Sequence, residues 1–275
     1  MEGEGIGAAA SFDVMSESAL KTDALTFSIA RTTDEILQAY RLVYDNYLKS
    51  GYIDQHPSLM RYGPHNALPS TVTFVAKLGE KVVTTATVVF DSPLGLPMEA
   101  IYRDELDALR KQGSRLCEVT MLADRRRAGM RTIPSILRLF RLIVPYAMRF
   151  EKATDIVITV NPTHAAFYSK YLLFEDLAGK KDYPSVKNAP AVARRVNLTN
   201  VQKKDKRPEV YKFFMGYSPS DDTFAGKKGF TQDELRDLFV VRRNVFPSMS
   251  EAALAWIRSQ YNGFDFDAIL APTGK

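Results

Sequence analysis

Cysteine, histidine and long apolar runs are scarce in this chain of 275 residues. The single cysteine, Cys117, excludes an internal disulfide framework and a metal site built from several cysteines. His56 and His65 lie in a proline-rich connection without a second ligand at a suitable spacing, so no metal site is expected. No stretch approaches the ~18 consecutive apolar residues of a membrane-spanning helix. A globular chain with one apolar core is the class that remains.

The composition supplies apolar residues for that core and a surplus of positive charge. Hydrophobic residues make up 45% of the chain, charged residues 25%, and the formal net charge is +5, which suggests an acidic partner. Residues 1–24 lack the basic start and apolar stretch of a secretory signal, so a mobile tail and a cytoplasmic protein are expected. The sequence leaves open whether the protein contacts a membrane surface. Residues 25–200 are predicted to form the main domain, and residues 201–275 a linker and helical extension packed on it.

The stretch from Ser114 to Glu151 is the centre of this organisation. Leu116–Leu122 is predicted to be a central strand, and apolar residues with a period of about 3.6 predict a long helix that starts close to Pro134. The turn between them contains Gly129. Arginines follow one another through this unit, at positions 125, 126, 127, 131, 138, 141 and 149. Backbone N–H groups and the helix dipole suit such a turn to a phosphate, and a solvated helix face is the alternative.

The flanking segments predict strands alternating with helices. Strands are expected at 25–30, 71–78, 81–90, 155–160, 172–177 and 191–198, and helices after Thr32, over 101–112 and after Asn161. The last two strands are separated by a basic loop that contains Lys180, Lys181 and Lys187. Residues 199–228 are expected to be a polar linker. Thr231 and Ser248 are predicted to cap two amphipathic helices.

Two charged residues fall among apolar ones. Glu118 lies in the middle of the central strand, where burial should raise its carboxyl pKa and suit it to act as a general base. Arg41 has the spacing of the apolar face of its helix, where a guanidinium needs a carboxylate partner. A structural pair of Glu118 with Arg41 is therefore the alternative to a functional role for both. Cys117 points to the other strand face, so an acyl-cysteine intermediate is not expected.

The order of elements resembles the GNAT acyltransferase superfamily. Arg126-Arg127-Ala128-Gly129-Met130-Arg131 is similar to the turn that binds the pantetheine phosphate, although Arg131 stands where glycine or alanine is usual. The long-chain N-acyl amino acid synthases, relatives of the acyl-homoserine-lactone synthases, are more similar. The segments that match them are Tyr40–Tyr44, Gly51–Asp54, Glu118-Val119 and Pro162-x-His164-x-x-Phe167-Tyr168. The resemblance spans roughly residues 25–262 and implies an α+β fold, an α/β/α sandwich with a central mixed sheet and a C-terminal helical extension.

The resemblance also implies a reaction, the transfer of a fatty acyl group from an acyl carrier protein thioester to the amine of an amino acid. The donor substrate is then an acyl-phosphopantetheine thioester on the carrier protein or on coenzyme A, and no tightly bound cofactor is implied. By the same resemblance Glu118 is the base and Tyr168 lies near the leaving sulfur, while acceptor binding falls to Arg41, Tyr44 and His164. Carrier or pantetheine binding is expected of Arg126, Arg127, Gly129 and Arg131. Core packing for Tyr168 and helix capping for His164 remain alternatives.

Two other functions compete with this interpretation. One is acyl transfer from coenzyme A to a different amine; the arginines exceed what one pyrophosphate needs, which favours an acidic carrier protein. The other is nucleic-acid binding through the Arg125–Arg141 cluster. The chain has no zinc, RNP or helix-turn-helix pattern, so no nucleic-acid partner is expected. The sequence therefore predicts an acyltransferase, and leaves the acceptor amino acid and acyl chain length unspecified.

Overall fold

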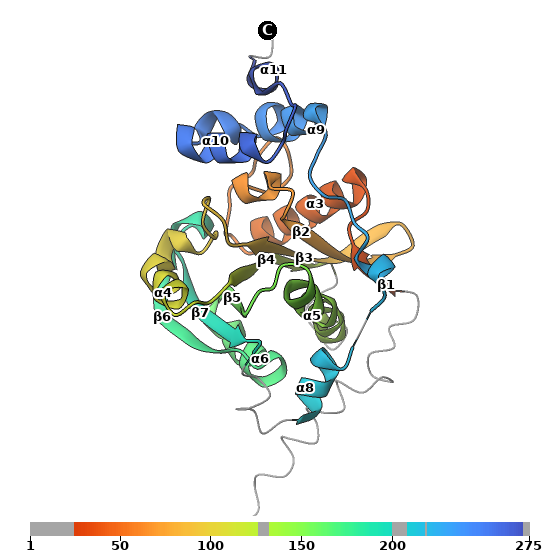
Figure 1. The fold of residues 1–275 in the computed structure, drawn as a ribbon, viewed down its shortest axis with the longest axis vertical. Helices are drawn as coiled ribbons and strands as arrows, with labels where there is room; N and C mark the ends of the chain where they lie inside the picture. The colour runs from red at the N-terminus through yellow and green to blue at the C-terminus, as the bar shows by residue number, and fades with distance from the viewer. Residues whose placement is uncertain (1–24, 126–131, 200–207, 218, 272–275) are drawn as a thin grey trace, which may run out of the picture.

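One mixed β-sheet of seven strands forms the centre of the molecule (Figure 1). The computed structural model describes residues 25–125, 132–199, 208–217 and 219–271. The strand order is β1-β2-β3-β4-β5-β7-β6. The strands are β1 (Leu25–Ile29), β2 (Val72–Leu78), β3 (Lys81–Phe90), β4 (Leu116–Asp124), β5 (Asp155–Val160), β6 (Glu175–Tyr183) and β7 (Ala189–Asn197). All neighbours pair antiparallel except β4 and β5, which are parallel.

Helices cover both faces of this sheet, so the predicted α+β sandwich is confirmed (Figure 1). The helices of the main domain are α3 (Thr33–Lys49), α4 (Glu99–Lys111), α5 (Thr132–Arg149) and α6 (Pro162–Leu172). Cys117 and Val119 pack in the core under α5, whereas Leu116 packs with residues of α4. Successive strand residues point to opposite faces. Cys117 is thus fully buried on the face away from Glu118, as expected.

The C-terminal extension covers the sheet on both sides. Helix α8 (Pro208–Met215) lies along α5, where the Arg141 guanidinium sits 4.8 Å from the Phe213 ring centre. The remaining elements are α9 (Gln232–Arg236), a π-helical turn η4 (Asp237–Arg242), α10 (Glu251–Ser259) and α11 (Phe266–Leu270). They stack beyond α3 (Figure 1). Phe239 and Phe246 share an apolar core there with Tyr40 of α3, and burial of such rings is the main force that holds the extension in place.

Hydrogen bonds fix the extension to the long connection between α3 and β2. The Tyr62 hydroxyl donates to the Leu238 carbonyl at 2.5 Å, and the Tyr261 hydroxyl donates to the Ala67 carbonyl at 2.5 Å. The first of these bonds ends on the π-helical turn η4. Because both hydroxyls are buried, losing either bond would leave a polar group unsatisfied.

Several element boundaries differ from those expected. The proposed strand at 172–177 is wrong at its start, because Leu172 ends α6 and Leu173 turns the chain with a φ of +63°. Lys180 and Lys181 accordingly lie in β6 and not in a loop. A short apolar run fits a helix end or a strand equally well, which explains the error. The segment expected to be a linker contains α8, and no local sequence pattern predicted that this helix packs on α5.

Capping was predicted correctly at Thr231 and wrongly at Ser248. The Thr231 hydroxyl accepts from the Glu234 N–H, and the Glu234 carboxylate accepts from the Thr231 N–H. Helix α10 is capped by Ser250, whose hydroxyl accepts from the Ala253 N–H at 3.3 Å. Ser248 instead bonds to carbonyls of the preceding turn. Within the described residues, none of the helices has the length and apolarity that crossing a bilayer requires.

Candidate active site

The two parallel strands at the centre of the sheet separate immediately after Glu118. β4 and β5 pair only through Leu116–Asp155, Cys117–Ile156 and Glu118–Val157. Beyond this point β4 continues beside β3 alone, and β5 continues beside β7. The register with β3 shifts between Thr120 and Ala123, and Met121 in the bulge has a φ of +53°. A bulge with a left-handed non-glycine residue is typical of functional sites. Glu118 therefore lies at the start of an opening in the sheet.

Glu118 is a carboxyl group with little hydration and no opposite charge beside it. Its side chain is 2% exposed, and its Oε2 accepts a hydrogen bond from the Met98 N–H at 2.8 Å. Burial raises the pKa of the Glu118 carboxyl to about 8; the Met98 N–H lowers this pKa and the nearby Glu99 carboxylate raises it. No ion pair reaches it from any residue that the structure describes. A carboxyl with a pKa near neutrality can both accept and release a proton at physiological pH.

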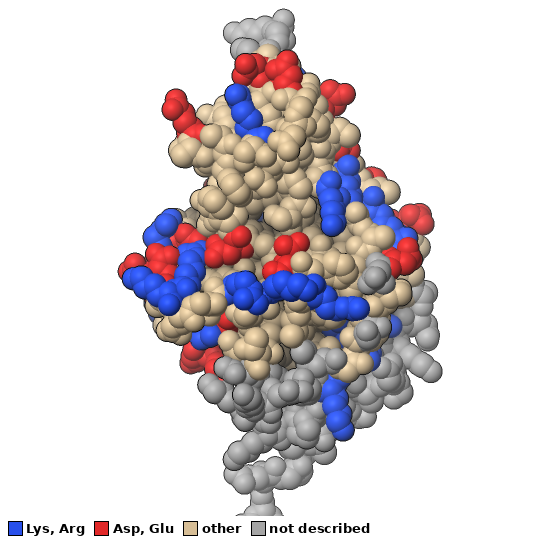
Figure 2. Space-filling view, in the orientation of Figure 1, with Lys and Arg blue, Asp and Glu red and all other residues tan. Residues whose placement is uncertain are grey.

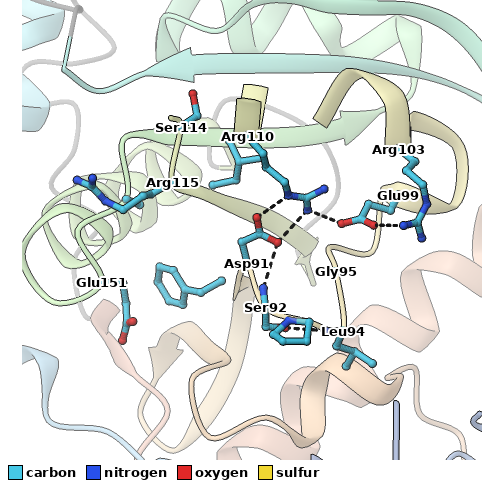
Figure 3. Close-up of a pocket in the computed structure, with 14 residues that line it drawn as sticks. Asp91, Ser92, Leu94, Gly95, Glu99, Arg103, Arg110, Ser114, Arg115 and Glu151 are labelled. Carbon is cyan, nitrogen blue, oxygen red and sulfur yellow. Dashed lines mark hydrogen bonds and ion pairs between the residues drawn. The ribbon is translucent and has the colours of Figure 1, made fainter. Parts of the chain in front are cut away.

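The Met98 N–H is held in place by a network around Arg110 (Figure 3). Arg110 donates to both oxygens of Asp91, at 2.7 and 2.8 Å, and also pairs with Glu99 and Asp107. The Glu99 carboxylate accepts from the Leu96 N–H at 2.9 Å, which fixes the turn that leads to Met98. This network positions the amide that contacts Glu118.

The same network lines a hollow of about 570 Å³, the Arg110 hollow, at the ends of β3 and β4. Its lining includes Asp91, Glu99, Arg103, Arg110, Arg115 and Glu151. In Figure 3 the guanidinium groups of Arg110 and Arg103 both reach carboxylates. The hollow lies where β4 begins, away from the opening between β4 and β5. Its size alone does not make it the active site, because its central guanidinium is already neutralised.

Three tyrosines have raised pKa values, and the charge of Glu118 contributes to two of them. Burial raises the pKa of Tyr47, Arg61 lowers it and Glu118 raises it, so this ring lies within the field of both charges. Burial and Glu118 likewise raise the pKa of Tyr183, whose hydroxyl donates to the Pro97 carbonyl at 3.1 Å. The pKa of Tyr168 is raised by burial and by Tyr47. These phenols keep their protons at neutral pH and can donate hydrogen bonds.

Tyr168 combines core packing with a hydroxyl to which none of the described residues bonds. Its ring, 8% exposed, contacts Phe140, Phe167 and Phe174. No residue within the described ranges hydrogen-bonds its hydroxyl. The packing alternative is therefore correct for the ring, and the hydroxyl remains available for chemistry.

A second hollow, the Arg243 pocket, lies next to these tyrosines. It has a volume of about 280 Å³ and is lined by Tyr44, Tyr52, Ile53, Asp54, Gln55, His56, Arg61, Pro184, Ser185, Lys187 and Arg243. Arg61 donates to the Ser185 carbonyl at 3.0 Å, and Arg243 donates to the Met60 carbonyl at 2.6 Å. The Tyr52 hydroxyl accepts from the Asn161 side chain at 3.3 Å, which connects the pocket to the start of α6. Neither Arg61 nor Arg243 was found by sequence reasoning, since nothing local distinguishes them from surface arginines.

The structure brings some of the expected site residues together and not others. Tyr44 is buried, lines the Arg243 pocket, and accepts from the His56 N–H at 3.1 Å. Arg41 is exposed, so the expectation that it lies on the apolar face and pairs with Glu118 is wrong. The buried stripe of α3 runs through Ile36, Tyr40 and Val43. Arg41 follows Tyr40 directly, and consecutive helix residues point in directions about 100° apart, so its side chain lies outside this stripe.

His164 is also exposed, and the alternative that it caps α6 is wrong. The Asn161 side chain caps this helix instead by accepting from the Thr163 N–H at 3.0 Å. The expected carrier-binding turn with Arg126, Arg127, Gly129 and Arg131 lies outside the described residues. The described residues contain no group of three or more His, Cys, Asp and Glu side chains that could hold a metal ion.

Comparison with known proteins identifies the family. The sequence profile described as N-acyl amino acid synthase FeeM matches residues 38–197, more than half of the chain. The chain belongs to this family of N-acyl amino acid synthases. It is therefore an acyltransferase enzyme, as the resemblance predicted. No curated protein sequence matches it.

Solved structures agree with this family. The structure of FeeM, an N-acyl amino acid synthase from uncultured soil microbes, is 28% identical with a TM-score of 0.58, and the similarity covers 68% of this chain and 99% of FeeM. A coenzyme A-dependent acyl-homoserine lactone synthase, BjaI, shares the fold at 15% identity, with a TM-score of 0.51 over 75% of this chain and 96% of that one. Residues after 197, which include Arg243, lie outside the range that the family profile matches.

On one face of the molecule, the distribution of charge does not fit a nucleic-acid interface. Figure 2 displays a row of Lys and Arg side chains across the middle of this face, with Asp and Glu side chains beside many of them. A surface that binds nucleic acid is dominated by positive charge. On this face the two signs are mixed.

Proposed function

We propose that this protein transfers a fatty acyl group from the thioester of an acyl carrier protein to the amine of an amino acid. The observation that carries the proposal is Glu118, a buried carboxyl with a raised pKa at the point where β4 and β5 separate. The family supplies the reaction class. An amine must lose a proton to attack a thioester, and Glu118 is the described residue best suited to take it.

The reaction then has a simple balance of bonds and protons. The amine nitrogen attacks the thioester carbonyl and passes a proton to the Glu118 carboxylate. The C–N bond forms, the C–S bond breaks, and the sulfur leaves as a thiolate. The Tyr168 phenol, protonated at neutral pH, supplies the proton that turns the thiolate into a thiol. Proton transfer from Glu118 back to the phenolate through the solvent restores both groups.

The donor carries a phosphopantetheine arm whichever molecule bears it. Arg126, Arg127, Gly129 and Arg131 are proposed to bind this arm and an acidic carrier protein, because their sequence is basic and directly precedes Thr132, the first residue of α5. Coenzyme A is the alternative donor, which the fold relative BjaI uses. The two donors share the arm and differ in the acidic protein surface, which only the carrier offers to further arginines.

The test is a purified reaction with two donors. Acyl carrier protein and coenzyme A, each loaded with acyl chains of several lengths, are mixed with the protein and the common amino acids. Free thiol and N-acyl amino acids are measured by mass spectrometry. We expect N-acyl amino acid from the carrier-protein donor at a higher kcat/KM than from coenzyme A. A higher kcat/KM with coenzyme A would contradict the donor assignment, and absence of any N-acyl amino acid would contradict the function.

A further inference from the structure

The Arg243 pocket holds two guanidinium groups that form no ion pair with any carboxylate of the described residues. These groups belong to Arg61 and Arg243, and their hydrogen bonds go to backbone carbonyls. The pocket's acidic residue, Asp54, is engaged by Lys187 at 2.6 Å. Two unneutralised guanidinium groups in one small pocket repel each other, and an anion placed between them would relieve that repulsion.

Arg243 is also incompletely hydrogen-bonded. Its Nε is buried and has no hydrogen-bond partner among the described residues. Burial and the proximity of Arg61 lower the pKa of this guanidinium. A buried N–H without an acceptor is rare in folded proteins and costs free energy, so it points to an acceptor that comes from outside the chain.

The extension holds Arg243 in this position by an unusual backbone turn. Arg243 directly follows the π-helical turn η4, and its N–H donates to the Leu238 carbonyl at 3.3 Å. The same carbonyl accepts from the Tyr62 hydroxyl, and the Arg243 guanidinium lies 5.5 Å from the Tyr62 ring centre. π-Helical turns are frequent at functional sites, where they place one side chain that a regular helix would direct elsewhere.

The pocket suits a small polar anion and not an acyl chain. Its volume of about 280 Å³ lies near the lower limit for small-ligand sites, ~300–1,000 Å³. Its lining is largely polar. His56 adds a neutral donor: its Nδ1 accepts from the Ser58 N–H, which leaves the ring proton on Nε2. A carboxylate has the planar shape and the charge that guanidinium groups bind best.

The pocket is connected to Glu118 through Tyr183, which directly precedes the pocket residues Pro184 and Ser185. The Tyr183 hydroxyl donates to the Pro97 carbonyl at 3.1 Å, and the N–H of the next residue, Met98, donates to Glu118 at 2.8 Å. An α-amino acid carries its amine next to its carboxylate. A carboxylate held at the pocket would present the amine toward the opening between β4 and β5.

We propose that the Arg243 pocket binds the carboxylate of the amino-acid acceptor, with Arg61 and Arg243 as its ligands. This assignment rests on the proposed function and adds to it a residue from outside the family-matched range. Arg243 thereby makes the C-terminal extension part of the acceptor site. It replaces Arg41, which is exposed.

The experiment compares acceptors with and without a carboxylate. KM is measured for an amino acid and for its carboxamide in the wild type, Arg61→Met and Arg243→Met, with donor saturating. Arg242→Met is the matched control, because Arg242 is exposed and pairs with Asp237 at the surface. Loss of one charged hydrogen-bonding partner should raise KM for the amino acid about 10- to 100-fold. KM for the carboxamide and for the donor should change little, and the control should match the wild type.

Each other outcome has a definite meaning. If the wild type acylates amino acids while both Met variants keep its KM values, the pocket assignment is wrong and the proposed function stands. A rise in donor KM instead would mean that the pocket binds the phosphate of the donor, which also overturns the assignment. A wild type that acylates no amino acid overturns the proposed function and this assignment together. Should Arg243→Met fail to fold, Arg61→Met decides by the same criterion.

Discussion

Arg110 and Arg243 each line a hollow, and their surroundings differ. Arg110 contacts the carboxylates of Asp91, Glu99 and Asp107. Arg243 contacts a single carbonyl and leaves its Nε without a partner among the described residues. The first arrangement is complete within the chain, and the second lacks an anion.

The difference separates a structural arginine from a binding one. The Arg110 hollow is the larger of the two, but its network serves to hold the Met98 N–H against Glu118. The Arg243 pocket is smaller and has unsatisfied charge, which is what a substrate anion requires. The Arg110 network holds the Met98 N–H that donates to Glu118, and the Arg243 pocket is proposed to bind the substrate on which Glu118 acts.

Removing Glu118 should have the largest effect on catalysis. Glu118→Gln keeps the size of the side chain and cannot accept the amine's proton, so kcat should fall by ~10²–10⁴-fold with little change in either KM. In the wild type, the rate should rise with pH through about 8, where the carboxylate forms. The variant should lose this rise. Steady-state rates between pH 6 and 10 measure both effects, and since the amine also deprotonates, only the difference between the two profiles counts.

The largest loss of stability is expected when a side chain is truncated in the core that supports the Arg243 pocket. Phe239 is fully buried, stacks on Phe246 at 5.1 Å and contacts Tyr62. Phe239→Ala should lower the free energy of unfolding by ~3–5 kcal/mol. Val241→Ala is the control, because Val241 is exposed on the same turn and should change little. Urea unfolding measures both, and a mild effect at Phe239 would mean that the extension contributes little to stability.

Glu118 should also make stability depend on pH, with a definite sign. Its pKa is about 8 in the folded protein and near its usual 4.5 in the unfolded chain. Between these values the unfolded chain loses the proton while the folded protein keeps it, so rising pH favours unfolding. The wild type should lose stability from pH 5 to pH 9 relative to Glu118→Gln. Equal pH dependence in the two proteins, measured by urea unfolding, would place the Glu118 pKa near its usual value.

Breaking the Arg110 network should destabilise the protein and alter Glu118. Arg110→Met leaves Asp91 and Glu99 without their shared partner and should cost about 1–3 kcal/mol of stability. Glu99, left with Arg103 as its one basic partner among the described residues, and a looser Met98 N–H should both raise the pKa of Glu118, so the rate should rise with pH at higher values than in the wild type. Arg103→Met is the control, because Arg103 is 67% exposed and touches Glu99 from outside. A pH profile that stays in place would mean that the network does not position the amide.

The smallest effect is expected at Arg41. Because its side chain is exposed, Arg41→Ala should change the free energy of unfolding by less than about 0.5 kcal/mol and leave both KM values near those of the wild type. A large rise in acceptor KM would return Arg41 to the acceptor site and weaken the assignment to Arg243.

The sequence by itself predicted most of the sheet, the central helix and the burial of Glu118. A run rich in β-branched residues predicted β3, and a period near that of a helix predicted α5, because both signals are local. A lone glutamate among apolar strand residues indicated burial, and the structure agrees. Local patterns failed at Leu172, where the same apolar residues fit a helix end or a strand. They also failed at Arg41, which was assigned to the apolar face of its helix from the apolar residues near it in sequence.

Only the tertiary structure decided which arginines are neutralised. Arg110 meets Asp91 from another element, and Arg61 and Arg243 come together from positions far apart in the chain. Whether a guanidinium finds a carboxylate depends on this packing and not on the residues beside it in sequence. The extension was predicted to pack on the main domain, yet its contribution of Arg243 depends on one π-helical turn and the Tyr62 hydroxyl that binds it. Such placement comes from long-range contacts, which the spacing of residues does not encode.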